Sequence, residues 1–513
     1  MSRAEVLVVG AGPVGLVLAC ELLSRDVAVR LVDMAPDKPT HSRAAIIWPR
    51  ILEQLRRISV TGTLVEAGHR VDAVAFYSDR RPLGEVSMAE LGGTPYPYGL
   101  TIPQDRTERI LTQRLHALGG RIERGVTLES LGQDAESVHG VLRHADSSTE
   151  EFVTGWLVGA DGAHSTVRKL LGVPFDGDAP EITFAVADAA VSGGHSVRKM
   201  HYFYSRAGAF GLAPLDDRTF RMAISIPPRQ PGDGPPSREL FQQMLTARGS
   251  GEVHDLEWSS AFTLRCRTAS QFRAGRCFLA GDAAHIMSPA GGQGMNTGIL
   301  DAVDLGWKLG GTIRGAFRPD ILDTYDADRR RAALRVTATT TLQTRWGLLS
   351  RPAQIAVRDT AYRLAHRTGV VQRVAAPVLS QLSVGYGRGP SVRELVTHRP
   401  PGPGDRVPAF VPDDAAVRTG PWPALARDDL TVLLWRGRAK RSSWAARTRV
   451  IRATAPPGVP VVDVANDPAS VADFGPAPLA LLVRPDGHVV RRLPIDDPLG
   501  LHGALAPWHR RHR

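Results

Sequence analysis

The amino-acid sequence predicts a fold of mixed α/β and α+β class in three parts, and three observations indicate it. A strand, a glycine-rich turn and a helix follow one another at residues 5–24 and again at 276–312. Residues 180–262, between them, form a pattern of alternating strands rich in aromatic side chains. After a Pro/Gly-rich stretch at 398–404, three more strand patterns follow. We therefore expect a Rossmann-like nucleotide-binding domain, a β-sheet domain inserted into it, and a smaller C-terminal domain.

Length and composition are those of a multidomain globular chain. The 513 residues, 43% of them hydrophobic and 22% charged, suffice for two or three well-buried cores. The formal charge of +11 raises the question of a nucleic-acid or membrane partner, but the basic residues are scattered and nearly all are arginine. Only 509–513 forms a basic cluster, which we interpret as a solvated tail. We expect no nucleic-acid partner.

The three cysteines, Cys20, Cys266 and Cys277, form neither a disulfide framework nor a metal-binding spacing. The sequence therefore favours a reducing, cytoplasmic location and predicts no metal site. The apolar run that ends at Cys20 resembles a secretion signal, but Glu5 and the glycines from position 10 onward contradict that interpretation. No other run approaches the roughly 20 apolar residues that span a bilayer, so no membrane partner is expected.

The first glycine-rich turn has the spacing of a dinucleotide-binding fingerprint. It follows a buried strand at 5–9 and precedes a helix at 16–24, and Asp33 closes the next strand. In such turns the glycines allow close approach to a pyrophosphate, the helix N-terminus binds the anion, and the acid hydrogen-bonds a ribose. The predicted nucleotide-binding residues of this region are Gly10, Gly12, Pro13, Val14, Gly15 and Asp33.

Three polar residues farther along are weaker candidates for the same site. Arg43 is placed to meet a phosphate or a nicotinamide coenzyme, although a solvated arginine is equally compatible with the sequence. Gln104 precedes Asp105 and Glu108, which have the spacing of a helix capping box, and is therefore free to reach a ligand. Asp161 stands at the carboxyl end of a buried strand, where open α/β sheets bind ligands, but Asp-Gly is also a common turn.

The stretch 276–312 repeats the order of strand, turn and helix. Gly281-Asp282 ends the strand, a loop rich in proline and glycine follows, and a long helical pattern begins near Gly294. We expect the first N–H groups of that helix to face an anionic group of a ligand. The candidate residues here are Gly281, Asp282, Pro289, Gly292, Gly294, Met295 and Asn296.

The aromatic-rich strands of 180–262 are expected to cover a flat substrate. The sequence does not identify a catalytic base. His201, Tyr202, Tyr204 and Arg221 are candidates because they lie in these strands, and for each of them a structural role is the more economical interpretation. Farther on, the run Arg329-Arg330-Arg331 is expected to form a solvated helix face.

Together these motifs resemble the single-component flavin-dependent aromatic hydroxylases, the superfamily of p-hydroxybenzoate hydroxylase and phenol hydroxylase, and within it the branch that acts on aromatic polyketides. The resemblance rests on the two glycine motifs with Asp33, Arg43, Gln104 and 157–162, and it covers nearly the whole chain. One departure is Asp304, where a related pattern often has asparagine. The segment LLVRPDGHVVRR resembles part of the thioredoxin-like third domain of that branch. The C-terminal region contains no cysteine, which leaves a packing or dimer role for it.

The resemblance implies a division of the chain and a set of cofactors. The FAD-binding domain would comprise 1–70, 100–178 and 265–395, the substrate-binding sheet domain 71–99 and 179–264, and the thioredoxin-like domain 400–513. FAD would place its ADP half on the first glycine motif and its ribityl chain at Asp282, with 289–296 facing the isoalloxazine ring. NADPH or NADH would dock transiently, and O2 would be a co-substrate.

The resemblance also implies a function, with two alternatives left open. The expected activity is an NAD(P)H-consuming monooxygenase of antibiotic biosynthesis that hydroxylates a polycyclic aromatic or polyketide through a flavin C4a-hydroperoxide. A Baeyer–Villiger oxygenase on the same fold is not distinguished by the sequence. A non-catalytic protein that binds FAD or an aromatic ligand is the other alternative. A flavin halogenase is disfavoured because no two tryptophans are spaced as Trp-x-Trp.

Overall fold

The structure is a computed structural model that describes residues 4–37, 44–177, 182–206, 208–229, 233–248, 251–387, 400–410, 425, 428–495 and 497–508. Arg43, predicted to meet a phosphate, lies outside the described residues. Within those residues, no helix is both long and apolar enough to cross a membrane.

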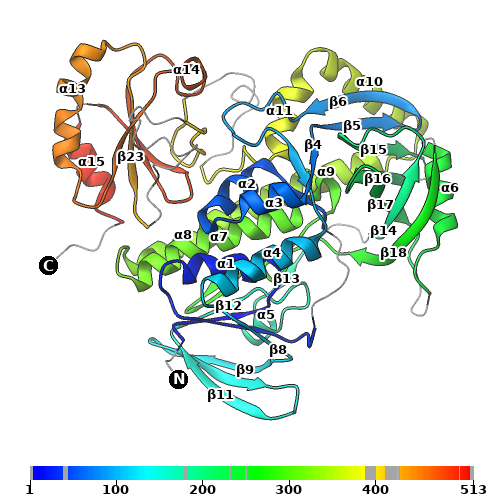
Figure 1. Ribbon diagram of the computed structural model, residues 1–513, viewed down its shortest axis with the longest axis horizontal. Helices are drawn as coiled ribbons and strands as arrows, with labels where there is room; N and C mark the ends of the chain where they lie inside the picture. The colour runs from blue at the N-terminus through cyan, green and yellow to red at the C-terminus, as the bar shows by residue number, and fades with distance from the viewer. Residues whose placement is uncertain are drawn as a thin grey trace.

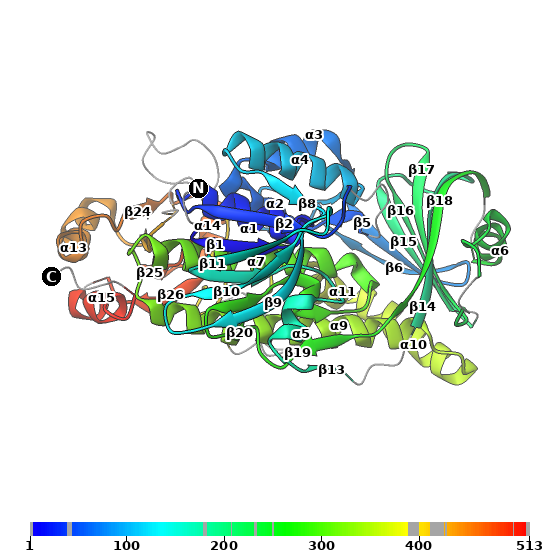
Figure 2. The same cartoon turned by 90° about the horizontal axis from the view of Figure 1, so that it is seen from below.

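A six-stranded sheet forms the base of the N-terminal part (Figures 1 and 2). β1 pairs in parallel with β2 on one side and β12 on the other, and β12 pairs in parallel with β21. Buried valines and leucines fill these strands, as expected for a sheet covered on both faces. The strands, in sheet order, are β20 (Arg273–Ala274), β21 (Cys277–Leu279), β12 (Trp156–Gly159), β1 (Val6–Val9), β2 (Val29–Asp33) and β8 (Ile122–Arg124).

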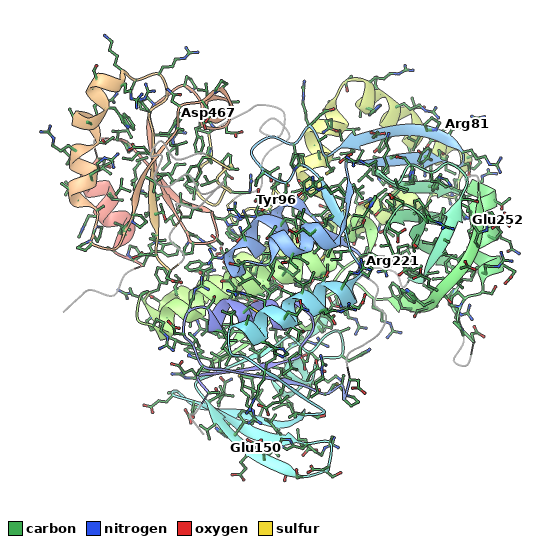
Figure 3. The ribbon with its side chains drawn as sticks, viewed as in Figure 1. Arg81, Tyr96, Glu150, Arg221, Glu252 and Asp467 are labelled. Atoms are coloured by element: carbon green, nitrogen blue, oxygen red, sulfur yellow. The ribbon has the colours of Figure 1, made fainter. Side chains whose placement is uncertain are left out.

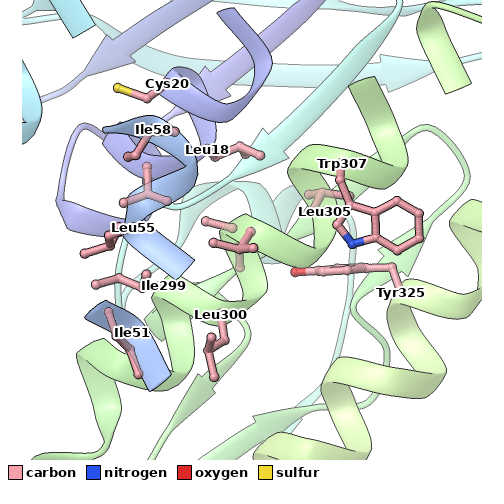
Figure 4. Packing of buried hydrophobic residues seen from close by; sticks show 14 of the residues in the cluster. Leu18, Cys20, Ile51, Leu55, Ile58, Ile299, Leu300, Leu305, Trp307 and Tyr325 are labelled. Atoms are coloured by element: carbon pink, nitrogen blue, oxygen red, sulfur yellow. The ribbon is translucent and has the colours of Figure 1, made fainter. Parts of the chain in front are cut away.

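Two helices that follow glycine turns pack closely on this sheet. α1 (Pro13–Leu23) lies against α7 (Gly294–Ile313), and α7 is buried along almost its whole length. Figure 4 shows the apolar side chains between them, including Leu18 and Ile299. A Cβ at Gly298 would come within 2.9 Å of the Gly281 Cα, so this glycine lets α7 approach the second glycine turn. The neighbouring helices are α2 (Pro49–Leu55), α3 (Thr61–Ala67), α4 (Gln104–Ala117) and α5 (Thr166–Leu170).

A seven-stranded sheet stands to the right of the six-stranded one in Figures 1 and 2, on the side away from the C-terminal region. The side chains of its strands alternate between the two faces of the sheet, and α6 (Arg238–Arg248) covers the outer face. In sheet order they are β18 (Glu252–Leu264), β14 (Ile182–Ser192), β17 (Thr219–Ile226), β16 (Gly208–Pro214), β15 (Lys199–Ser205), β5 (Ala73–Ser78) and β6 (Arg81–Ser87).

Small sheets complete this part of the chain. The first joins β3 (Ile46–Ile47), β7 (Gly99–Thr101) and β4 (His69–Val71). The second joins β11 (Thr149–Thr154), β10 (Val138–Arg143) and β9 (Thr127–Gln133). The third joins β13 (Phe175–Asp176), β19 (Arg267–Ala269) and β22 (His285–Ile286).

A run of helices follows α7 and corrects one prediction. It comprises α8 (Asp323–Tyr325), a π-helical turn η5 (Asp326–Arg330), α9 (Arg331–Gly347), α10 (Pro352–Arg367) and α11 (Val370–Leu379). The arginine run at 329–331 was expected to be solvated, but Arg329 is fully buried and its Nε donates to Asp301 Oδ1 at 2.8 Å. The prediction was wrong for Arg329 because the π-helical turn directs this side chain inward, whereas Arg331 is exposed.

The C-terminal region has its own four-stranded sheet. β24 (Val461–Val464), β23 (Thr431–Trp435), β25 (Leu479–Val483) and β26 (Val489–Leu493) follow one another in the sheet. Helices α13 (Arg441–Thr454), α14 (Pro468–Phe474) and α15 (Pro498–Leu505) accompany it.

The turn between β25 and β26 attaches this sheet to α7 through buried charges. Arg484 is 6% exposed and pairs with Asp304 of α7, with Asp328 at 2.7 Å and with Asp486 at 2.7 Å. Lys308 of α7 pairs with Asp304 at 2.7 Å. Asp304, the departure noted in the sequence, is therefore part of the contact between two regions of the fold.

Candidate active site

A cavity of about 1390 Å³ lies between the carboxyl edge of the six-stranded sheet and the inner face of the seven-stranded sheet. Residues of both glycine turns line one side of it, and residues of β14–β18 line the other. Predicted site residues on its wall are Gly12, Pro13, Val14, Gln104, Tyr202, Tyr204, Arg221, Asp282, Pro289, Gly292, Gly294 and Met295. Segments as far apart in the sequence as Gly12 and Leu348 thus meet at one cavity.

In the first glycine turn, the three glycines serve different purposes. A Cβ at Gly10, whose φ is +105°, would lie 2.3 Å from the Ala160 carbonyl oxygen, and a Cβ at Gly15 would lie 1.9 Å from the Gly10 carbonyl oxygen. Both glycines therefore permit close packing of backbone against backbone. A Cβ at Gly12 would meet no atom within 4 Å. The open space beside Gly12, at the N-terminus of α1, fits a phosphate of a dinucleotide.

Asp33 shapes this turn through two backbone hydrogen bonds. The Ala11 N–H donates to Oδ2 at 2.7 Å, and the Ala35 N–H donates to Oδ1 at 2.8 Å. These bonds hold the carboxylate at the end of β2, beside the turn. The arrangement fits the predicted ribose contact, which stays a prediction.

Asp161 makes local hydrogen bonds that the sequence did not suggest. Its carboxylate accepts hydrogen bonds from the backbone N–H groups of Thr166 and Val167, at 2.7 and 3.1 Å, and from the Ser165 hydroxyl. It therefore stabilises the N-terminus of α5. The adjacent Gly162 lines the cavity, and a Cβ there would meet no atom within 4 Å. Direct cofactor contact by the Asp161 carboxylate stays a prediction.

The second glycine turn is held from below by a buried ionic group. Asp301 of α7 accepts hydrogen bonds from the Gly281 N–H at 3.0 Å and from His285 Nε2 at 2.6 Å, and its other oxygen binds Arg329. Full burial would raise the pKa of Asp301, but the charge of Arg329 and the hydrogen bonds from His285 and Arg329 hold that pKa below its usual value. Asp282, next in sequence, is exposed and lines the cavity. The turn is thus fixed, and the Asp282 side chain lies on the cavity wall.

The loop at 289–296 is fixed by side chains from distant segments. The Trp48 Nε1–H donates to the Gly291 carbonyl at 2.8 Å. The Asn296 side chain accepts from the Trp48 N–H and donates to the Ile46 and Gly292 carbonyls. Asn296 is fully buried and holds the loop from behind; it does not line the cavity wall. Gly291 and Gly292 have φ values of +74° and +62°, which favour glycine.

The amino end of α7 points at the cavity. Gly294 and Met295 lie on the wall, and the preceding residue, Gln293, makes no side-chain cap hydrogen bond to the helix. The first N–H groups of a helix without such a cap present partial positive charge. This end of α7 fits an anionic edge of a flat cofactor.

The helix that carries Gln104 begins differently from the prediction. Pro103 is the N-cap of α4 and makes no side-chain cap bond, so the expected capping box of Asp105 with Glu108 was wrong. The helix starts at Gln104, two residues before the Arg106 start that an Asp105 cap would give, and Pro103 precedes it with extended backbone. The Gln104 Nε2–H donates to Glu108 Oε1 at 2.8 Å, and both side chains line the cavity.

The inner face of the seven-stranded sheet is a trough. Its floor, over β16 and β17, carries Ala209, Gly211, Ala213 and Ala223. Aromatic side chains rise on both sides: Tyr202 and Tyr204 on β15, and Phe184, Phe262 and Trp258 on β14 and β18. Small side chains between aromatic walls leave space for a flat, apolar ring system.

The four candidate catalytic residues occupy different environments. Tyr202 and Tyr204 line the cavity, and burial raises the pKa of Tyr202 to about 12. His201 points to the opposite face of the sheet, where its ring nitrogens meet Tyr77 and the Ser196 carbonyl, and burial lowers its pKa to about 4. The strand alternation that brings Tyr202 into the cavity takes His201 out of it. The structure therefore excludes His201 from direct contact with a ligand in this cavity.

Arg221, the fourth candidate, is on the cavity wall where the large sheet meets the nucleotide-binding part (Figure 3). It is 6% exposed and forms a two-pronged pair with Asp188, with both N–O distances at 2.7 Å. Its Nη1 donates to the Ala44 carbonyl at 2.8 Å. Arg221 thus connects β17 of the seven-stranded sheet to Ala44 of the nucleotide-binding part.

Comparison with known proteins identifies the family. Residues 3–340 match the family model described as FAD binding domain. The chain belongs to that family. It is 33% identical, over 99% of both chains, to the 12-dehydrotetracycline 5-monooxygenase/anhydrotetracycline 6-monooxygenase of Streptomyces rimosus. It is 38% identical to the 6-methylpretetramide 4-monooxygenase of the same genus and species, over 71% of this chain and 65% of that one.

A solved structure agrees with this assignment to the FAD-binding family. The OxyS anhydrotetracycline hydroxylase from Streptomyces rimosus superposes with a TM-score of 0.76 at 31% identity, and the match covers 99% of each chain. The predicted mixed α/β fold and the flavoprotein monooxygenase class are confirmed by these relatives. The cofactor is FAD, and O2 and a reduced nicotinamide coenzyme are the co-substrates of this class.

Sequence reasoning missed several residues of the cavity in this FAD-binding monooxygenase. Trp48 fixes the loop at 291, and Trp258 and Gln343 stand on the cavity wall. Each lies outside the glycine motifs, and only the fold brings it to the site. A tryptophan between the polar residues Glu257 and Ser259 was the one available signal for Trp258.

Proposed function

We propose that this FAD-dependent monooxygenase hydroxylates a flat, fused polycyclic aromatic compound of the polyketide type. The observation that carries the proposal is the trough, whose small-residue floor and aromatic walls face the glycine loops across one cavity. The relatives are named as monooxygenases of 6-methylpretetramide, 12-dehydrotetracycline and anhydrotetracycline, which supports the same substrate class here.

The residues present fit FAD. The free space beside Gly12 and the N-terminus of α1 suit its pyrophosphate, and the Asp282 carboxylate suits hydroxyl groups of the ribityl chain. The flavin ring belongs beside 289–295, where the amino end of α7 offers backbone N–H groups. When bound, FAD supplies the redox chemistry that activates oxygen, and the chain supplies position and a dry cavity.

The reduced nicotinamide coenzyme requires a place for its phosphates. His164 and Lys169 are exposed on the cavity wall next to the Asp161-Gly162 turn, and Arg265 and Arg267 lie there as well. Four basic side chains at one part of the wall favour an anionic ligand. We assign this basic rim to the docking of NADPH or NADH.

The phenol substrate would meet hydrogen-bond donors in the cavity. Since the pKa of Tyr202 is raised to about 12 and that of Tyr204 is also raised, both hydroxyl groups keep their protons at neutral pH. They can donate to a phenolate or carbonyl oxygen. Neither is suited to act as the base that removes the phenol proton.

The test is product analysis with labelled oxygen. Purified holoenzyme is incubated with NADPH or NADH, 18O2 and a panel of fused phenols and quinones, and products are examined by mass spectrometry and NMR. We expect coenzyme oxidation that depends on the aromatic compound and one labelled oxygen atom on a ring carbon. A ring-inserted ester would indicate Baeyer–Villiger oxygenation. Yellow protein that binds the compounds without coenzyme oxidation would indicate a non-catalytic binder and overturn the proposal.

A further inference from the structure

Trp258 has an orientation set by a buried carboxylate. Its indole N–H donates to Asp188 Oδ2 at 2.7 Å, and Asp188 is 4% exposed. The same carboxylate receives both prongs of the Arg221 guanidinium, which also lies 5.3 Å from the centre of the Trp258 ring. One hydrogen bond and one ring contact therefore hold Trp258, and two further hydrogen bonds from Arg221 fix the carboxylate that binds it.

The register of the sheet explains why these residues meet. Ala213, Arg221, Asp188 and Trp258 are direct partners across β16, β17, β14 and β18. Arg221 and Trp258 are on the cavity wall, and Asp188 stands between them in the row. A buried ion pair is costly to desolvate. The Arg221–Asp188 pair connects the trough floor to the aromatic wall that contains Trp258.

Trp258 also differs from the tryptophans of the core. Trp435 is fully buried, belongs to a hydrophobic cluster and donates its N–H to the Gly475 carbonyl. Trp258 is only partly buried and belongs to no hydrophobic cluster of the described residues. Core packing therefore does not account for a large ring held rigidly beside an open cavity.

The position of Trp258 defines the width of the trough between its two aromatic walls. β15, which carries Tyr202, and β18, which carries Trp258, are four strand spacings apart, about 19 Å at the usual separation of neighbouring strands. The two aromatic walls thus stand on opposite sides of the floor, where Gly211, Ala213 and Ala223 lie between them. A long ring system touches both walls, whereas a short one reaches only one.

We propose that Trp258 is a specificity-determining residue that selects fused polycycles long enough to span the trough, and that Asp188 is the positioning residue that fixes its ring. The inference rests on the proposed function and adds a residue-level basis for substrate length. The ring of Trp258 contacts the far end of the substrate, and the Asp188–Arg221 pair keeps the ring from turning into the trough.

The test compares a long and a short ligand on the holoenzyme. The two ligands are a hydroxylated naphthacenequinone and naphthol. Each dissociation constant is measured from the change in absorbance of the bound flavin when the ligand is added, without coenzyme. Trp258→Ala should weaken binding of the tetracyclic ligand about tenfold and binding of naphthol by less than about threefold. Trp258→Phe keeps a ring without the N–H and should give an intermediate loss.

A matched control is available in the C-terminal sheet. The Trp444 N–H donates to Asp463 at 2.9 Å, so Trp444→Ala removes the same kind of pair far from the cavity. It should leave both dissociation constants unchanged. Asp188→Asn should lower kcat/KM for the tetracyclic compound relative to naphthol at unchanged flavin content. If this variant does not fold, Trp258→Phe provides the test of ring fixation.

The outcomes separate the inference from the function on which it rests. If wild-type protein binds the tetracyclic compound but Trp258→Ala binds it equally well, or loses both ligands to the same extent, the inference is overturned and the proposed function stands. If wild-type protein binds and oxidises neither aromatic compound, the proposed function fails, and the inference fails with it.

Discussion

The FAD-binding part of this chain meets two other sheets, and the two contacts are built in opposite ways. The seven-stranded sheet faces it across a cavity with alanine, glycine and aromatic side chains. The C-terminal sheet meets it through Arg484, Asp304 and Lys308, all buried and joined by ion pairs. Buried charges need their partners in place and therefore fix one arrangement, whereas a hollow apolar wall can exchange water for a ligand. The difference separates a permanent attachment from a working site.

The largest effect is expected at the permanent attachment. Arg484→Ala would leave Asp304, Asp328 and Asp486 buried near one another with one cation fewer. We expect the free energy of unfolding to fall by about 3–5 kcal/mol, as measured by urea denaturation. Arg492→Ala, an exposed arginine of β26, is the control and should change little. An equal loss in both variants would show that the ion pairs do not carry the attachment.

On the cavity side, Asp282→Ala tests cofactor retention. The exposed carboxylate lines the cavity, and loss of charged hydrogen bonds of about 1.5–3 kcal/mol should weaken FAD binding roughly tenfold to a hundredfold. Flavin content after dialysis and titration of apoprotein with FAD provide the measurement. Circular dichroism should be unchanged. Full flavin occupancy in the variant would contradict the placement of the ribityl chain.

Filling the trough should affect ligands and spare the fold. Ala223→Leu adds side-chain volume to the floor, where there is space, so the melting temperature should stay close to that of the wild type. Binding of a tetracyclic phenol should weaken about tenfold because the added carbons occupy its place. Ala480→Leu, at a fully buried position of the C-terminal sheet, is a matched overpacking control and should lower the melting temperature without touching the cavity. Unchanged ligand binding in Ala223→Leu would mean that the ring system lies elsewhere.

The last prediction concerns the pH dependence of stability at the outer face of the large sheet. Burial lowers the pKa of His201 to about 4, below its value of about 6.5 in an unfolded chain. The stability that neutral His201 contributes is therefore full above pH 6.5 and is lost as pH falls from 6.5 towards 4, by at most about 1.4 kcal/mol per pH unit. Unfolding titrations should show a shallower slope in His201→Gln. An identical slope would assign the pH dependence to other groups.

Local sequence patterns were sufficient for the parts of the site made by consecutive residues. Gly12, Pro13 and Val14 line the cavity because the fingerprint encodes a strand, a turn and a helix in one short segment. The same holds for Gly292, Gly294 and Met295 at the start of α7. The capping box at Asp105 failed because the helix begins at Gln104, and helix ends are the least determined feature of a local pattern.

The roles of residues within the strands and helices were not predictable in the same way. His201 and Tyr202 are neighbours in the sequence, and only the register of β15 decides which of them enters the cavity. Arg329 was expected in solvent, but a π-helical turn places it under the second glycine turn beside Asp301. Asn296 was expected to face the cofactor, but its buried side chain hydrogen-bonds Trp48 and Gly292 behind the loop.

The sequence by itself determined the family, the fold class and the two glycine turns, since these depend on residue types at short spacings that make one local structure. Only the tertiary structure decided the trough, the Asp188–Arg221–Trp258 group and the attachment through Arg484. These features join residues tens to hundreds of positions apart. The stability of these features depends on burial and on partner residues that no local pattern contains. They could therefore be identified only once the packing of the sheets was known.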